Sequence, residues 1–171
     1  MLLGRVAAAF VLFSAPASMI VAQDLGKAER VHSPGNWIVL RTKDPMTDKA
    51  SCVAIYRGNY GVQLTDKSFY ISYRRRGGVS SYRVRFDDGP ASQMLLASDT
   101  ERQISAIGLS PAEFRLLLAA KRLRVSTFTA LGTVVDDDLD LEGIAEAHAF
   151  LGSGQCGGLK GEWTPKVRPE K

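Results

Sequence analysis

Short runs of hydrophobic residues, separated by turn-forming residues, make up the first half of this chain. Residues 37–42 (WIVLRT), 51–56 (SCVAIY) and 62–65 (VQLT) have the length and the β-branched or aromatic content of strands. The segments between them hold Asp-Pro and Gly-Asn-Tyr-Gly sequences, which favour turns. Because no helix-length pattern separates these runs, we expect the early strands to pair antiparallel.

The strongest pattern predicts a β-hairpin from residues 68–76 and 79–86. Gly77 and Gly78 lie between the two runs, and a two-glycine turn accommodates the positive φ values that tight hairpins need. This register places three cross-strand pairs on one apolar face: Tyr73–Tyr82, Ile71–Val84 and Phe69–Phe86. A slip by one residue would mix the apolar and polar faces, so pattern and turn favour one pairing.

The opposite face of the predicted hairpin is basic. It carries one tyrosine and four arginines: Tyr70, Arg74, Arg76, Arg83 and Arg85. Guanidinium groups bind carboxylates and phosphates through paired N–H donors, and a tyrosine ring can hold a guanidinium by a cation–π contact. We therefore expect this face to bind an anionic partner. The alternative is a solvated outer face that keeps the hairpin soluble.

Further strands are predicted in the second half of the chain. Residues 91–96 predict a strand, and residues 100–107 fit either a strand or a helix. Residues 122–135 predict one bent strand, or two strands with a break at Gly132.

Two short helices are predicted in the same half. Ser110, Pro111 and Glu113 form a helix-start signal, with an N-cap, a proline at the first position and a capping box. Residues 144–151 predict the second helix, which a Gly-Ser-Gly sequence ends. The predicted fold class is therefore mainly β: an antiparallel β-sandwich-like domain with two short helices in the C-terminal half.

The first 22 residues have the pattern of a secretory signal peptide. Arg5 gives a short positive region, residues 6–13 (VAAAFVLF) are apolar, and small residues follow. Cleavage fits after Ala17 and after Ala22, and the second site is favoured because a polar stretch begins there. An uncleaved N-terminal anchor is the alternative. The pattern predicts a periplasmic or secreted protein.

The rest of the chain divides into three predicted parts. These are a polar linker at residues 23–36, a single β-rich domain at 37–156, and a disordered tail at 157–171 that is rich in Gly, Lys and Pro. No further run is apolar and long enough to cross a membrane, so no membrane span is expected after signal cleavage.

The chain has two cysteines, Cys52 and Cys156, which an oxidising compartment would join in a disulfide. Closing a loop of roughly 100 residues would stabilise the fold by about 4–5 kcal/mol in the chain-entropy model. Two buried free thiols are the alternative. With two histidines as well, the chain lacks ligands for a zinc finger or an iron–sulfur cluster. The net charge of +4 is too mild to predict nucleic-acid binding.

Neither metal binding nor catalysis is predicted. Asp138, Asp140 and Glu142 resemble the start of a calcium loop, but its twelfth position is Ala149 instead of glutamate. A loop before a helix explains these acids, because negative charge is favourable near a helix N-terminus. The sequence contains no nucleophile-elbow, zinc-protease or phosphate-loop motif. We therefore expect a protein that is not an enzyme and that needs no cofactor.

Several short segments together resemble a known group of exported proteins. They are Trp37, the turn at residues 44–48 (DPMTD), residues 82–90 (YRVRFDDGP), and residues 139–143 (LDLEG) followed by Cys156. Their order resembles the exported accessory proteins associated with type VI secretion, the VasI/TagO group, over about residues 37–156. The resemblance implies a periplasmic, β-rich protein without enzymatic activity.

These observations predict a non-enzymatic binding or accessory protein of the bacterial envelope. It would dock an envelope protein or an anionic envelope component through the basic hairpin face. One alternative is an inhibitor or immunity-type protein against a cell-wall-degrading enzyme. A cell-wall hydrolase is a second alternative.

Overall fold

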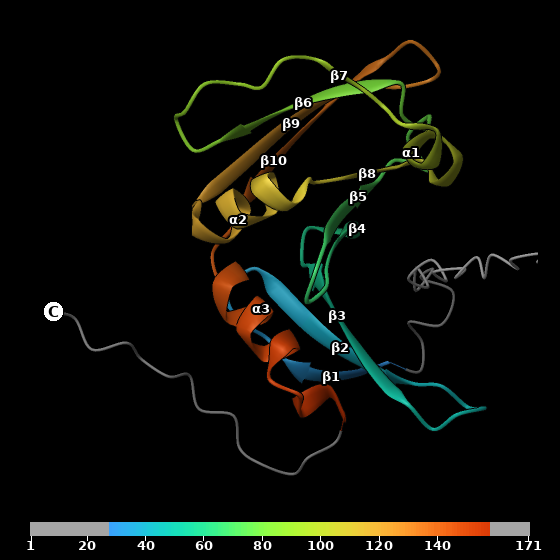
Figure 1. Cartoon of the computed structure of the whole chain (residues 1–171), viewed down its shortest axis with the longest axis vertical. Helices are drawn as coiled ribbons and strands as arrows, with labels where there is room; N and C mark the ends of the chain where they lie inside the picture. The colour runs from blue at the N-terminus through green and yellow to red at the C-terminus, as the bar shows by residue number, and fades with distance from the viewer. Residues whose placement is uncertain (1–27, 158–171) are drawn as a thin grey trace, which may run out of the picture.

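The computed structural model describes residues 28–157, and this part of the chain forms two antiparallel β-sheets (Figure 1). The larger sheet of the described chain has six strands in the order β1-β2-β3-β4-β5-β8. These are β1 (Glu29–His32), β2 (Trp37–Lys43), β3 (Ala50–Tyr56), β4 (Asn59–Leu64), β5 (Phe69–Ser72) and β8 (Ala106–Gly108). The strands from β1 to β5 follow one another in sequence, so the sheet is a meander that β8 extends at its far edge.

The smaller sheet within residues 28–157 has four strands in the order β10-β9-β6-β7. These are β6 (Ser81–Phe86), β7 (Leu95–Leu96), β9 (Arg122–Phe128) and β10 (Val134–Asp140). The break predicted at Gly132 is confirmed, because β9 and β10 form a hairpin whose turn includes that glycine at φ +78°. The predicted antiparallel, β-sandwich-like fold is confirmed as well.

Apolar side chains of both sheets and of the helices share one core. Trp37 and Phe69 come from the larger sheet, Leu123 from the smaller one, and Leu117 from a helix, and each is at most 1% exposed. Burying a side chain of this size stabilises the fold by about 1.5–3 kcal/mol. The alternation of buried and exposed positions along β5 and β6 is the one that the sequence predicts.

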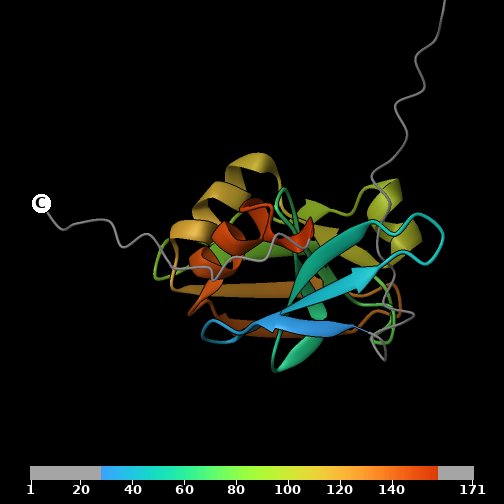
Figure 2. The same ribbon diagram turned by 90° about the horizontal axis from the view of Figure 1, so that it is seen from below.

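Three α-helices occur in the described residues: α1 (Asp99–Ile104), α2 (Pro111–Ala119) and α3 (Ile144–Gly152). The helix start predicted at Ser110 is confirmed, with a complete capping box to Glu113. The ambiguous residues 100–107 contain most of α1 and the first two residues of β8. Seen from below in Figure 2, α2 and α3 lie together on one side of the strands.

The predicted hairpin between residues 68–76 and 79–86 is wrong. β5 pairs with β4 and β8 in the larger sheet, whereas β6 pairs with β7 and β9 in the smaller one. Gly77 and Gly78 do have positive φ values, +97° and +73°, but the turn carries the chain from one sheet to the other. Both edges of β5 and both edges of β6 are occupied by other strands, so these two strands cannot pair.

A buried polar clasp fixes this crossing between the sheets. Tyr73 follows β5 and is fully buried, and its hydroxyl donates a hydrogen bond of 2.7 Å to Asp137 Oδ2 on β10. Arg76 donates to the other oxygen of the same carboxylate, also at 2.7 Å, and its guanidinium carbon lies 4.3 Å from the centre of the Tyr73 ring. One carboxylate of the smaller sheet therefore holds both residues of the crossing.

Three smaller expectations also need correction. Residues 29–32, assigned to a polar linker, form β1 and pair with β2. Within residues 91–96 only Leu95 and Leu96 form a strand, β7. Asp138 and Asp140, expected in a loop before a helix, lie in β10, where Asp138 pairs with Arg122.

The predicted disulfide between Cys52 and Cys156 is confirmed, and it joins β3 to the segment after α3. The predicted signal peptide at residues 1–22 lies outside the described residues, as does nearly all of the predicted tail. Among residues 28–157, no helix is both long and apolar enough to cross a membrane.

Reducing the disulfide is expected to lower the free energy of unfolding by about 4–5 kcal/mol, because the bond closes a separation of 104 residues in the unfolded chain. Urea unfolding with and without a thiol reductant measures this difference. A loss below about 1 kcal/mol would mean that the bond does little to restrict the unfolded state.

Substituting Asp137→Asn is expected to lower the free energy of unfolding by about 2–3 kcal/mol. The change removes a charged acceptor that is only 9% exposed, and it leaves Arg76 without its ion pair. Asp136→Asn is the matched control, since this neighbouring side chain is exposed and has no partner within the described residues. The control should change stability by less than about 0.5 kcal/mol. Equal effects of the two substitutions in chemical denaturation would contradict the clasp.

Candidate functional site

The structure separates the residues of the predicted basic face. Tyr70 lies on β5, Arg74 and Arg76 lie in the crossing, and Arg83 and Arg85 lie on β6 in the other sheet. Because β5 and β6 belong to different sheets, the five side chains do not share one hairpin face.

The arginines also differ in what they contact. Arg76 is held by Asp137, and Arg85 donates to the backbone carbonyl groups of Gly89 and Asp88 at 2.8 and 3.3 Å. Arg74 and Arg83 are exposed. Tyr70, expected on one face with the arginines, lines a cavity with a different set of residues.

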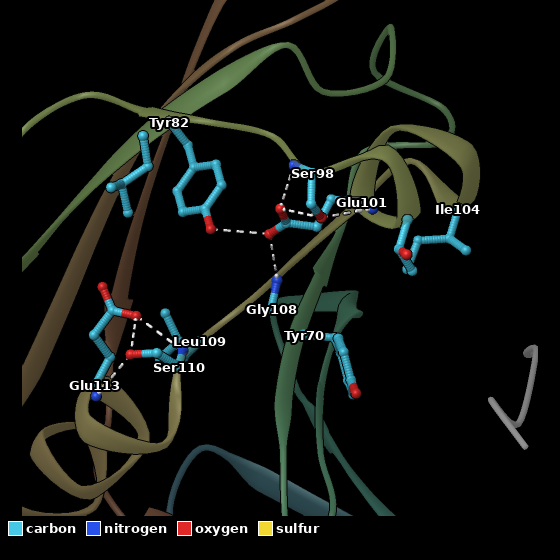
Figure 3. A pocket seen from close by; sticks show the side chains of 11 residues that line it. Tyr70, Tyr82, Ser98, Glu101, Ile104, Gly108, Leu109, Ser110 and Glu113 are labelled. Carbon is cyan, nitrogen blue, oxygen red and sulfur yellow. Dashed lines mark hydrogen bonds between the residues drawn. The ribbon is translucent and has the colours of Figure 1, made fainter. Parts of the chain in front are cut away.

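This cavity lies where the segment from β7 to α2 passes between the two sheets (Figure 3). Its volume is about 430 Å³. It is lined by Tyr70, Tyr82, Leu95, Ser98, Thr100, Glu101, Ile104, Gly108, Leu109, Ser110 and Glu113. The lining thus combines residues from β5, β6, β7, β8, α1 and the start of α2.

Glu101 is the most heavily hydrogen-bonded residue of the cavity. Its Oε2 accepts from the backbone and the hydroxyl of Ser98, both at 2.8 Å, which completes the capping box of α1. Its Oε1 accepts from the Tyr82 hydroxyl at 2.9 Å and from the Gly108 N–H at 3.3 Å. One carboxylate therefore connects α1, β6 and β8, as Figure 3 shows.

The electrostatics of Glu101 follow from these contacts. Burial raises the pKa of its carboxyl, but the hydrogen bonds from Ser98, Tyr82 and Gly108 favour the charged form more strongly, so the pKa is lowered overall. The pKa of the Tyr82 hydroxyl is raised, first by burial and then by its hydrogen bond to Glu101. At neutral pH the pair therefore consists of a carboxylate and a neutral phenol.

Glu113 forms a second, simpler capping box on the other side of the cavity. Its Oε2 accepts from the backbone and hydroxyl of Ser110, at 2.8 and 2.7 Å. Its Oε1 has no hydrogen bond to any residue in the described part of the chain. Glu113 is half-buried, so this oxygen is available to a bound molecule.

The lining fits a cation that carries an apolar stem. None of the described residues that line the cavity is basic, although the whole chain has a net charge of +4. Tyr70, Leu95, Ile104 and Leu109 supply apolar surface, and the two tyrosine rings can attract a cation through their faces. A general acid needs a raised carboxyl pKa, and the pKa of Glu101 is lowered, so this carboxyl does not suit the role of a general acid.

One local signal for this site is present in the sequence and was missed. Ser98 and Glu101 have the Ser-x-x-Glu spacing of a capping box, which predicts the start of α1. The approach of Tyr82 to Glu101 has no such signal, because it depends on the crossing between the sheets. Metal binding has no candidate here: within residues 28–157, no three His, Cys, Asp or Glu side chains are grouped as ligands.

Substituting Glu101→Gln is expected to lower the free energy of unfolding by about 1–2 kcal/mol at pH 7. This is the contribution of a helix cap together with a hydrogen bond to a charged group. A carboxyl with a lowered pKa stabilises the fold above its ordinary pKa of 4.5, and the effect disappears as the pH falls through the lowered value. The difference from the parent protein should therefore shrink below about pH 4.5. Thermal unfolding from pH 3 to 7 measures it, and a difference that does not change with pH would contradict the assignment.

Comparison with known proteins identifies no family for this chain. No family model matches it, and no curated protein matches it. Among solved structures, it is similar to the crystal structure of invasion associated protein B from Bartonella henselae, at 15% sequence identity and a TM-score of 0.47. The similar region covers 72% of this chain and 95% of that one. The resemblance to the accessory proteins of type VI secretion stays a prediction.

Proposed function

We propose that this protein is a non-enzymatic binding protein of the bacterial envelope, whose cavity takes a cationic group on an apolar stem. A lysine side chain of a partner protein has this chemistry. The observation that carries the proposal is the cavity lining. In it, Glu101 and Glu113 lie among tyrosines and aliphatic side chains, and none of the described residues that line the cavity is basic. The free Oε1 of Glu113 would accept a hydrogen bond from the ammonium group.

The two carboxylates have different roles in this proposal. Glu101 already accepts four hydrogen bonds, so it contributes fixed negative charge and holds Tyr82 in place. Glu113 has a free acceptor and would make the direct contact. The aliphatic stem would lie against Leu95 and Leu109, which are partly exposed at the cavity.

The location in the envelope rests on the sequence and on the cysteine pair. A disulfide is compatible with an exported protein, because such bonds persist in oxidising compartments. The separation of the predicted arginine face removes the geometric basis for docking an anionic partner through all five residues. The inhibitor and hydrolase alternatives remain predictions from the sequence.

Titration by NMR with three small compounds tests the proposal. Nα-acetyl-lysine methylamide is expected to bind weakly and to shift the amide signals of Tyr82, Gly108 and Leu109. The norleucine compound has the same aliphatic stem without the ammonium group, and it should bind about fivefold more weakly, since a partly exposed charge pair contributes about 1 kcal/mol. The glutamate compound should not bind at this cavity.

Two variants separate the cavity from general charge effects. Glu113→Gln should remove the preference for lysine over norleucine, whereas Glu142→Gln, an exposed carboxylate outside the cavity, should keep it. Equal binding of lysine and norleucine by the parent protein would contradict the proposal. Preferred binding of glutamate, with shifts near Arg83 and Arg85, would restore the anionic partner instead.

A further inference from the structure

The outer face of the four-stranded sheet carries an exposed apolar row. Val134, Phe128, Ser81 and Leu96 are direct cross-strand partners on β10, β9, β6 and β7. The three apolar members are 50%, 43% and 82% exposed, respectively, and Leu131 in the adjoining turn is 78% exposed. Exposed apolar surface of this kind marks interaction sites, because leaving it in water is unfavourable.

The next row on the same face carries two opposite charges, one on each side of the central strand β9. Arg83 on β6 and Asp136 on β10 are both cross-strand partners of Ser126 on the central strand β9. Both charged side chains are exposed, and neither has a hydrogen bond or ion pair in the described part of the chain. With strands about 4.8 Å apart, the two backbones lie at equal distances on either side of Ser126.

This pattern is complementary to itself. Consider a two-fold axis that is parallel to β9 and lies midway between the facing sheets. It places β6 of one copy opposite β10 of the other copy. Arg83 of each copy would then face Asp136 of the other copy, and Phe128 would meet its own symmetry mate. An isologous contact needs a surface that is complementary to itself. Opposite charges at equal distances from the axis, beside an apolar row, provide such a surface.

We propose that two copies of this chain associate face to face through this surface. The occupant that fits is a second copy because two Arg83–Asp136 pairs form at once and each copy covers Phe128 and Val134 of the other. One row further along, Asp138 and Arg85 again lie on either side of β9, but the central residue is Arg124, which would meet its own symmetry mate, and all three residues already have partners within the chain.

The area of the contact surface determines how tightly the two copies are expected to bind. The three strands that lie opposite one another, β10, β9 and β6, have six or seven residues each and cover roughly 300 Å² per copy, from a strand spacing of about 4.8 Å and a rise of about 3.4 Å. This is at the low end for protein interfaces, so a weak dimer with a dissociation constant in the micromolar range is expected. The contact is separate from the cavity, and the failure of one proposal does not affect the other.

Sedimentation velocity from about 5 to 300 µM tests the proposal on the mature protein. The parent protein should shift from monomer to dimer over this range. Arg83→Asp and Asp136→Arg should each weaken the dimer at least about tenfold, because each places like charges opposite one another. The double variant, with both charges exchanged, should regain most of the association.

The variants are at exposed positions, so circular dichroism and thermal unfolding should match the parent protein. A second readout uses Ser126→Cys, which lies close to the axis; a short bis-maleimide should crosslink this cysteine between copies, because facing sheets lie about 10 Å apart. A parent protein that stays monomeric at 300 µM would overturn the proposal. So would single variants that associate as well as the parent, or a double variant that does not recover.

Discussion

The fold depends on the clasp between Tyr73, Arg76 and Asp137. Tyr73 is fully buried at the end of the larger sheet, and its hydroxyl shares the Asp137 carboxylate with Arg76. A buried hydroxyl without a partner would cost several kcal/mol, so the carboxylate of β10 must lie where the chain leaves β5. This contact stabilises the crossing to the smaller sheet, together with the pairing of β5 with β8 and of β6 with β9. The position of β6, and with it of Tyr82, follows from that crossing.

The cavity is a consequence of the same crossing. With β6 in the smaller sheet, the Tyr82 hydroxyl reaches Glu101, while Glu101 also accepts from Gly108 of the larger sheet. The carboxylate thus joins the two sheets through Oε1, while its Oε2 caps its own helix. The space that remains between these groups and Glu113 is acidic and partly apolar, which is why a cationic ligand is the chemistry proposed for it.

Local features of the fold could be predicted from the sequence, and pairing partners could not. The capping box at Ser110, the Cys52–Cys156 pair and the alternation of buried residues all depend on neighbours in sequence or on composition. The positive φ at Gly77 was also predicted, but a two-glycine turn does not determine whether the next strand returns beside β5. That choice depends on β8, β9 and Asp137, which come later in the chain. The cavity could not be predicted for the same reason.

The most direct test of this account is the pairing of β5 and β6, which NMR can measure from backbone nuclear Overhauser effects. The account predicts backbone contacts between Val84 and Val125 and between Ile71 and Ile107, which are cross-strand partners in the structure. It predicts none between the backbones of Ile71 and Val84. Backbone contacts between Ile71 and Val84 would restore the simple hairpin and its basic face, and would remove the basis for both the clasp and the cavity.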